Sequence, residues 1–177
     1  MIPPGLHSHN NIILVGLMGS GKSTVGRLLS RQMQLPFHDT DQEIVRRTGV
    51  SIPMIFEVEG EAGFRKREEQ VLSEMVHRDG VVLATGGGIV LSEANRKLIR
   101  EHGTVIYLRA SVDELWSRTR HDKNRPLLQV EDPKARLFEL LTARDPLYRE
   151  VADLIVDTGR QPVQALVGHL IRHLRSR

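Results

Sequence analysis

The chain has 177 residues, with 25 Lys and Arg against 22 Asp and Glu, which gives a formal net charge of +3. This length suits one domain, and 40% hydrophobic with 27% charged residues is a globular composition that excludes disordered and fibrous classes. The chain has no cysteine, which excludes a disulfide framework, a thiolate metal site and a cysteine nucleophile. Without a long apolar run or a signal-peptide pattern, we expect a cytoplasmic protein with no membrane segment.

The isoelectric point near 9.6 raises the question of a nucleic-acid partner. The net charge is small, however, and aromatic residues make up only 4% of the chain, which leaves few platforms for base stacking. Arg172, Arg175 and Arg177 fall at the end of a predicted C-terminal helix, where cations interact favourably with the helix dipole. We therefore expect no nucleic-acid partner.

Short apolar runs alternate with helical periods along the chain, which is the pattern of βαβ units and a parallel sheet. The runs that predict strands are 11–17, 35–38, 81–84, 104–108 and 154–156. Apolar stripes at helical spacing, from Val25 to Met33 and from Val163 to Leu174, predict the two clearest helices.

Capping residues predict where further helices begin and end. Capping boxes begin at Thr40 and at Ser111, and Asp132 before a proline has the pattern of an N-cap. Gly49 and Gly103 are expected to end helices.

Two further stretches have distinct patterns. Ser51 and the following proline open a helical segment that runs toward position 76, with an expected break near Gly60 and Gly63. Residues 121–132 are polar and poorly periodic, so we expect a mobile loop there.

Residues Gly16–Ser23 match the phosphate-binding pattern G-x-x-x-x-G-K-[ST], with a predicted strand before them and a helix after them. Glycines let consecutive backbone N–H groups face phosphates, and the helix N-terminus adds its positive dipole end. We expect Lys22 to reach the β- and γ-phosphates and the Ser23 hydroxyl to bind Mg²⁺.

Polar residues follow two other predicted strands: Asp39 and Asp41 follow the second, and Gly86–Gly88 follow the third. Ligands of parallel sheets bind outside the carboxyl ends of the strands, so these residues are expected to share a crevice with the phosphate loop. There Asp39 would steady a metal or its waters, and Asp41 would bind or deprotonate an acceptor hydroxyl. The alternatives are that the acids only cap a helix and that the glycines only form a flexible turn.

The class favoured by these residues is a small-molecule kinase. The third strand lacks the acid of motor ATPases, and the guanine-reading pattern of GTPases is missing. Small-molecule kinases close a basic lid to exclude water, and arginines can bind carboxylates or phosphates through two parallel hydrogen bonds. Arg125 lies in the loop at 121–132, while Arg65 and Arg144 are expected at the borders of helical stretches; the residues alone do not choose among the arginines.

The chain resembles the shikimate kinase family from the phosphate loop to the last strand. The blocks that carry the resemblance are Gly16–Thr24, Asp39–Asp41, Ser51–Glu68, Gly86–Gly88, Arg125–Leu128 and Arg144–Tyr148. The phosphate loop is common to many NTPases, whereas the other blocks in this order and spacing are far more specific.

The resemblance implies an α/β fold: the three-layer P-loop kinase fold, with a five-stranded parallel sheet ordered 2-3-1-4-5 and flanked by helices. It implies a single domain over 1–177, with a leader at 1–10, a substrate-binding segment at about 41–76 and a small lid at about 118–132. The implied activity is Mg²⁺-dependent transfer of the γ-phosphoryl group of ATP to the 3-hydroxyl of shikimate, giving shikimate 3-phosphate and ADP, in the biosynthesis of chorismate and aromatic amino acids. The implied protein is a monomer whose partners are the small molecules ATP and shikimate.

The resemblance also implies roles for individual residues. The catalytic residues would be Asp41 as the base, Lys22 and Arg125. Shikimate would be held by Asp41, by the backbone of Gly86, Gly87 and Gly88, and at its carboxylate by Arg65 and Arg144. ATP would be bound by Gly19, Ser20, Gly21, Lys22, Ser23, Thr24, Arg118, Arg125 and Gln161, and Mg²⁺ by Ser23 and Asp39.

Two alternatives stay open at this point. A kinase of the same fold acting on gluconate or a nucleoside monophosphate is disfavoured by Arg65, Gly86–Gly88 and Arg144 in their blocks. A nucleotide-binding protein without catalysis is disfavoured by the intact set of Lys22, Asp41 and Arg125.

Overall fold

The computed structural model describes residues 10–177, so the predicted leader lies outside the described residues except for Asn10. A five-stranded sheet has the order β2-β3-β1-β4-β5, and every neighbouring pair is parallel, which confirms the expected fold class. The strands are β1 (Asn11–Val15), β2 (Phe37–Asp39), β3 (Val82–Ala84), β4 (Gly103–Arg109) and β5 (Leu154–Asp157).

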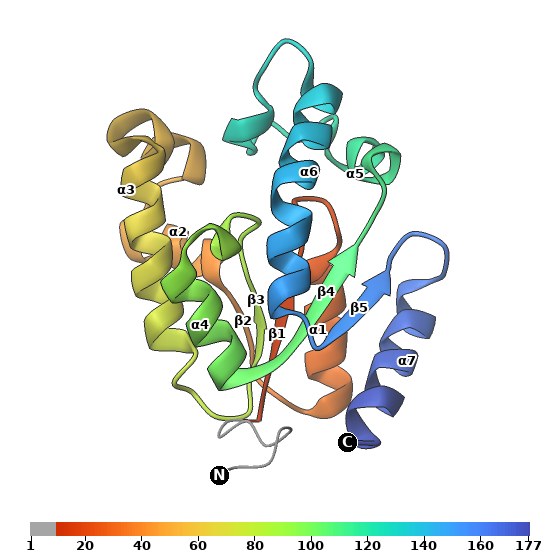
Figure 1. Ribbon diagram of the computed structural model, residues 1–177. Coiled ribbons are helices and arrows are strands. Elements are labelled where there is room, and N and C mark those ends of the chain that lie inside the picture. Colours follow the sequence, from red (N-terminus) through yellow and green to blue (C-terminus); the bar gives the residue numbers. More distant parts are fainter. Residues whose placement is uncertain (1–9) are drawn as a thin grey trace.

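Helices cover both faces of this sheet (Figure 1). They are α1 (Lys22–Met33), α2 (Thr40–Thr48), α3 (Ile52–Met75), α4 (Glu93–His102), α5 (Val112–Thr119), α6 (Pro133–Val151) and α7 (Val163–Arg175), with the short 3₁₀ turns η1 (Ile89–Leu91) and η2 (Pro126–Leu128). Among the described residues, none of these helices is long and apolar enough to cross a membrane.

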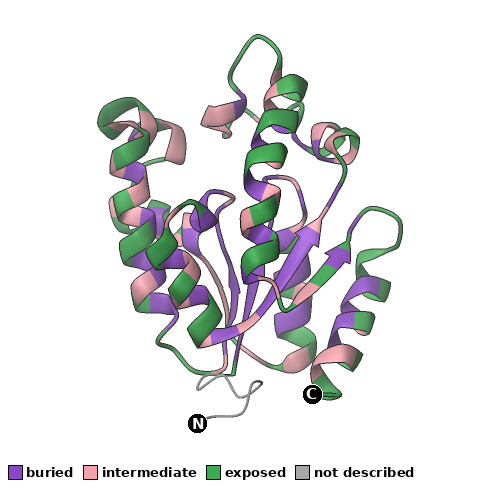
Figure 2. Ribbon diagram, in the orientation of Figure 1, coloured by how far each residue is buried: buried purple, intermediate pink, exposed green. Residues whose placement is uncertain are grey.

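The central strand β1 divides the core into two apolar layers. Side chains of a strand alternate between its two faces, so Ile12 and Leu14 pack with α1 and α7, while Ile13 and Val15 pack with helices on the opposite face. Because both faces are covered, all of β1 is buried (Figure 2), and a strand of this kind has a continuous apolar sequence rather than an alternating one. Because the strands are parallel, their carboxyl ends lie at one edge of the sheet.

The helix ends agree with the predicted caps, except at the start of α2. Ser111 forms the expected capping box with Glu114, Asp132 caps α6, and Gly49 ends α2 with φ of 72°. Gly103 follows α4 as expected but is extended and opens β4.

The prediction that Thr40 caps α2 is wrong by one residue. The Asp39 carboxylate accepts hydrogen bonds from the N–H groups of Asp41 and Gln42, at 2.9 and 3.2 Å. Thr40 is buried, and its hydroxyl accepts a hydrogen bond from the Gly86 N–H at 3.0 Å. The Thr40 side chain therefore bonds to the glycine loop Gly86–Gly88 and does not cap the helix.

Helix α3 has the predicted break at Gly60, where φ is 74° and ψ is 176°. A left-handed φ is readily adopted only by glycine, so the bend depends on this residue. The break therefore falls at the first of the two glycines near which it was expected, and Gly63 continues the helix. The bend folds the first turns of α3 over the rest of the helix (tan in Figure 1), and Phe56 before it lines the same cavity as Arg65 after it.

Candidate active site

Two cavities of about 410 and about 420 Å³ lie at the carboxyl ends of β1, β2 and β3. The first, the acceptor cavity, is lined among others by Phe56, Arg65, Glu68 and Arg144. The second, the phosphate cavity, is lined by the phosphate loop and the start of α1. The two share Met18, Asp41, Gln42, Gly86, Gly87 and Arg125. A ligand in one cavity can therefore touch a ligand in the other.

The phosphate loop has the backbone that anion binding requires. Gly19 and Gly21 have φ of 83° and 97°, which only glycine adopts without strain. No side chain caps α1, so the N–H groups of its first turn stay available for an anion, and the helix dipole adds to the attraction. Gly21, Ser23 and Thr24 line the phosphate cavity, as predicted.

Lys22 is buried at the start of α1 and holds the phosphate loop together. Its Nζ donates to the carbonyl oxygens of Gly16 and Leu17, at 2.6 and 3.0 Å. Burial, with a smaller contribution from the Arg125 charge, lowers the Lys22 pKa to about 8. Phosphate groups in the cavity would favour the charged ammonium again, because an opposite charge stabilises it.

Ser23 and Asp39 form the pair of oxygen donors that a magnesium ion would need. The Ser23 Oγ donates to the Asp39 Oδ2 at 2.6 Å, while the Asp39 Oδ1 caps α2. Within residues 10–177 no cluster of three or more His, Asp or Glu could hold a metal ion. Mg²⁺ fits a two-residue site, because it keeps several waters and takes further oxygens from phosphates.

Asp41 lies in the first turn of α2 where the two cavities meet. Its Oδ1 is buried and has no hydrogen-bond partner among residues 10–177. Burial and the neighbouring Asp39 charge raise the Asp41 pKa, and the Lys22 charge opposes them. This oxygen lies against Gly86, since a Cβ on that glycine would come within 2.7 Å of it, while Asp41 as a residue lines both cavities.

Arg65 and Arg144 both line the acceptor cavity, from α3 and α6. They lie inside these helices, so the expectation that they border helical stretches is wrong. For Arg144 the reason is that α6 continues through Pro146. A proline normally disfavours helical backbone angles for the residue before it. Arg144 is buried, and its Nη1 has no hydrogen-bond partner among the described residues.

Glu68 is a site residue to which the sequence analysis gave no role. It is only 1% exposed, and its Oε1 accepts a hydrogen bond from Arg65 Nη1 at 3.0 Å. Its Oε2 is buried without a partner among residues 10–177, and burial raises its pKa to about 7. The signal that could have found it is its position three residues after Arg65, which places both on one face of a helix.

The shifted pKa of Glu68 predicts a pH-dependent stability difference between the wild type and Glu68→Gln. The folded pKa of about 7 lies above the ordinary value of 4.5, so the native state binds more protons in this window and stability falls as pH rises through it. Between pH 4.5 and 7.5 we expect the free energy of unfolding of the wild type to fall by up to about 3 kcal/mol relative to that of the variant. Urea unfolding of both proteins across this range measures the difference; a constant difference would contradict the shift.

Two of the remaining arginines lie at the site. Arg125 lines both cavities and donates from Nε to the Asp122 Oδ2 at 3.0 Å. Arg118 on α5 lines the phosphate cavity and donates to the Gly19 carbonyl at 2.9 Å. The loop expected at 121–132 includes the turn η2, whose Leu128 is buried.

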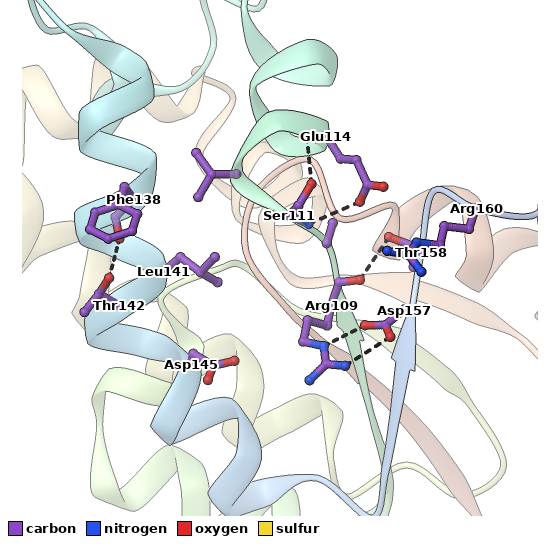
Figure 3. A pocket seen from close by; sticks show the side chains of 12 residues that line it. Arg109, Ser111, Glu114, Phe138, Leu141, Thr142, Asp145, Asp157, Thr158 and Arg160 are labelled. Atoms are coloured by element: carbon purple, nitrogen blue, oxygen red, sulfur yellow. Dashed lines mark hydrogen bonds and ion pairs between the residues drawn. The ribbon is translucent and has the colours of Figure 1, made fainter.

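The structure does not bring Gln161 to either cavity, although the sequence analysis expected it at ATP. Gln161 is exposed and lines neither cavity. Its neighbour Arg160 lines a groove of about 570 Å³ between α5, α6 and the ends of β4 and β5 (Figure 3).

The polar groups of this groove are largely engaged with one another. Arg109 forms two hydrogen bonds with Asp157, at 2.6 and 3.0 Å, and Ser111 and Glu114 pair in the capping box (Figure 3). The groove contains none of the predicted catalytic residues, so we assign the chemistry to the two cavities that meet at Asp41.

The chain matches one family of known proteins over most of its length. The model of the family described as shikimate kinase matches residues 18–175. The chain belongs to the shikimate kinase family. It is 59% identical over 164 residues to a shikimate kinase from Nitrosospira multiformis, covering 93% of this chain and 84% of that protein. A shikimate kinase from Burkholderia pseudomallei is 57% identical over 166 residues, covering 94% and 90%.

Solved structures also place the chain among shikimate kinases. A shikimate kinase from Acinetobacter baumannii in complex with shikimate matches with a TM-score of 0.93 and 48% identity, over 96% of this chain and 95% of that one. A gluconokinase from Sinorhizobium meliloti, at 18% identity and a TM-score of 0.58 over 94% and 92%, shares the fold alone. As a shikimate kinase family member the chain is an ATP-dependent kinase, and this chemistry implies a divalent metal ion.

Proposed function

We propose that this protein transfers the γ-phosphoryl group of ATP to the 3-hydroxyl of shikimate in the presence of Mg²⁺, giving shikimate 3-phosphate and ADP. The observation that carries the proposal is the position of Asp41, which lines both the phosphate cavity and the acceptor cavity. A hydroxyl bound to the Asp41 carboxylate would lie beside the phosphate cavity, which is the arrangement that direct transfer requires.

The acceptor cavity is complementary to a small hydroxylated carboxylate. Arg65 and Arg144 offer guanidinium groups to a carboxylate, and the Asp41 carboxylate offers an acceptor to hydroxyls. Guanidinium groups bind planar carboxylates through paired hydrogen bonds. The complex of the Acinetobacter baumannii relative with shikimate supports this choice of acceptor.

In the proposed mechanism Asp41 accepts the proton of the attacking hydroxyl, and the raised pKa of its carboxyl suits a general base better than an ordinary aspartate pKa. Lys22 and Arg125 stabilise the charge on the transferring phosphoryl group, which accounts for most catalysis in such reactions. Ser23 and Asp39 would hold the metal ion, which when bound neutralises phosphate charge.

The proposal also assigns two segments of the chain to substrate binding and to a lid. Residues 41–76 form the substrate-binding segment and residues 118–132 the lid of one domain, with the ion pair of Arg125 and Asp122 inside that lid. A monomeric state, the lack of a nucleic-acid partner and a cytoplasmic location stay predictions from the sequence.

Removing either arginine of the acceptor cavity should weaken shikimate binding. We expect Arg144→Ala and Arg65→Ala to raise the shikimate KM about 10- to 100-fold, because each removes a charged hydrogen-bond donor, and to leave the KM for ATP within about twofold. Steady-state kinetics with each substrate varied measures both constants.

Arg67→Ala is the matched control, because Arg67 lies on the same helix and pairs with the exposed carboxylate of Glu59 outside the cavity. A shikimate KM that rises equally in all three variants would contradict the proposed arginine clamp.

The proposed function is tested by measuring ADP release from Mg-ATP with shikimate, gluconate, AMP, CMP or no acceptor. We expect ADP with shikimate alone, together with a singly phosphorylated product. Turnover with another acceptor would overturn the assignment of shikimate, and ATP binding without turnover would overturn the assignment of catalysis.

A further inference from the structure

The loop Gly86–Gly88 separates the two cavities and is held from two sides. On one side the Gly86 N–H donates to the Thr40 hydroxyl at 3.0 Å. On the other side the Gly87 carbonyl accepts a hydrogen bond from the Tyr148 hydroxyl. Gly87 itself lies close to the phosphate loop and to Arg144, since a Cβ on it would come within 3.4 Å of Met18 N and 3.5 Å of Arg144 Nη1.

Tyr148 is a buried residue on α6 that lines neither cavity. Its ring packs against that of Tyr107 with the centroids 4.9 Å apart. Arg144 lies one turn earlier on the same helix. The Tyr148 hydroxyl therefore bonds to the glycine loop from a helix that also carries one arginine of the acceptor cavity.

The hydrogen bond from the Tyr148 hydroxyl to the Gly87 carbonyl also orients the peptide N–H that follows this carbonyl. In a planar trans peptide the C=O and the following N–H point in opposite directions. Because the Gly87 carbonyl is turned toward Tyr148, the Gly88 N–H is turned away from it, and Gly88 lines the acceptor cavity. Glycine has many accessible backbone conformations, so a run of three glycines needs such an anchor to keep one orientation.

We propose that the Tyr148 hydroxyl is a positioning group for the acceptor: it orients the Gly87–Gly88 peptide without touching the substrate. The inference rests on the proposed function, because shikimate is the probe. It predicts that loss of this hydroxyl impairs the acceptor side of the reaction and spares the nucleotide side.

The test compares Tyr148→Phe with Tyr107→Phe in the full chain. Each variant removes one phenolic hydroxyl from the same pair of packed rings, but the Tyr107 hydroxyl bonds to Asp145 at 2.8 Å and not to the loop. For Tyr148→Phe we expect kcat/KM for shikimate to fall about tenfold, with the KM for ATP within about twofold. For Tyr107→Phe we expect both constants to stay near those of the wild type.

A second measurement keeps the proposal testable if Tyr148→Phe is poorly active for structural reasons. Thermal unfolding reports stability, and the NMR amide signals of residues 86–88 report the loop directly. The proposal predicts a lower backbone order parameter for Gly88 in Tyr148→Phe but not in Tyr107→Phe. Unchanged shikimate kinetics in Tyr148→Phe, or equal effects of both variants on both substrates, would overturn it. A wild type without shikimate turnover would instead overturn the proposed function.

Discussion

Replacing Asp41 with Asn is expected to lower kcat by at least about 100-fold, because general-base catalysis contributes about 10²- to 10⁴-fold. The amide keeps the size and one oxygen acceptor of the carboxylate but cannot take up the hydroxyl proton. We therefore expect the shikimate KM to change by less than about fivefold. Initial rates at saturating ATP and Mg²⁺ measure both constants.

Asp39→Asn is the matched control, because Asp39 lies two residues away and bonds to the Ser23 hydroxyl instead of facing the acceptor cavity. Raising the Mg²⁺ concentration is expected to restore part of the activity of Asp39→Asn and none of that of Asp41→Asn. Near-normal turnover of Asp41→Asn would leave Asp41 as a binding residue only.

The second large effect is expected for Lys22→Met. In the proposed mechanism the Lys22 ammonium, which lines the phosphate cavity, stabilises the transferring phosphoryl group, and loss of one preorganised donor of this kind costs about 10²- to 10³-fold in kcat. Methionine replaces most of the volume of the lysine stem. Because the buried carbonyl oxygens of Gly16 and Leu17 lose their donor in the variant, we expect its melting temperature to fall, and thermal unfolding measures this so that kcat is compared where both proteins are folded.

Lys97→Met controls for loss of a lysine in general, since Lys97 is exposed on α4 and only 3.9 Å from a carboxylate oxygen of Glu101. Its kinetics should match the wild type. If Lys22→Met kept more than about a tenth of the wild-type turnover, the electrostatic role of Lys22 would be contradicted.

Much of the fold could be predicted from local pattern, because the pattern has direct physical causes. Strand β1 is covered on both faces, so its residues form a continuous apolar run, and the caps at Ser111 and Asp132 depend on side chains within one helical turn. The bend of α3 could be located because a left-handed φ falls on Gly60.

The parts that could not be predicted depend on contacts between distant segments. The sequence around Thr40 has the pattern of a helix cap, but the Thr40 hydroxyl bonds to Gly86, which is remote in sequence. From its spacing alone Glu68 would be an exposed ion-pair partner of Arg65, and only the packing of α3 shows that it is buried. Arg144 lies inside a helix because tertiary packing carries α6 through Pro146.

The most direct test of the proposed reaction is the position of phosphate on the product. Phosphorus–proton correlation NMR on the reaction of the wild type with Mg-ATP and shikimate identifies the phosphorylated hydroxyl. We predict one product, with phosphorus coupled to the proton on carbon 3 of shikimate. Phosphate on another hydroxyl, or inorganic phosphate alone, would contradict the proposed placement of the acceptor beside Asp41.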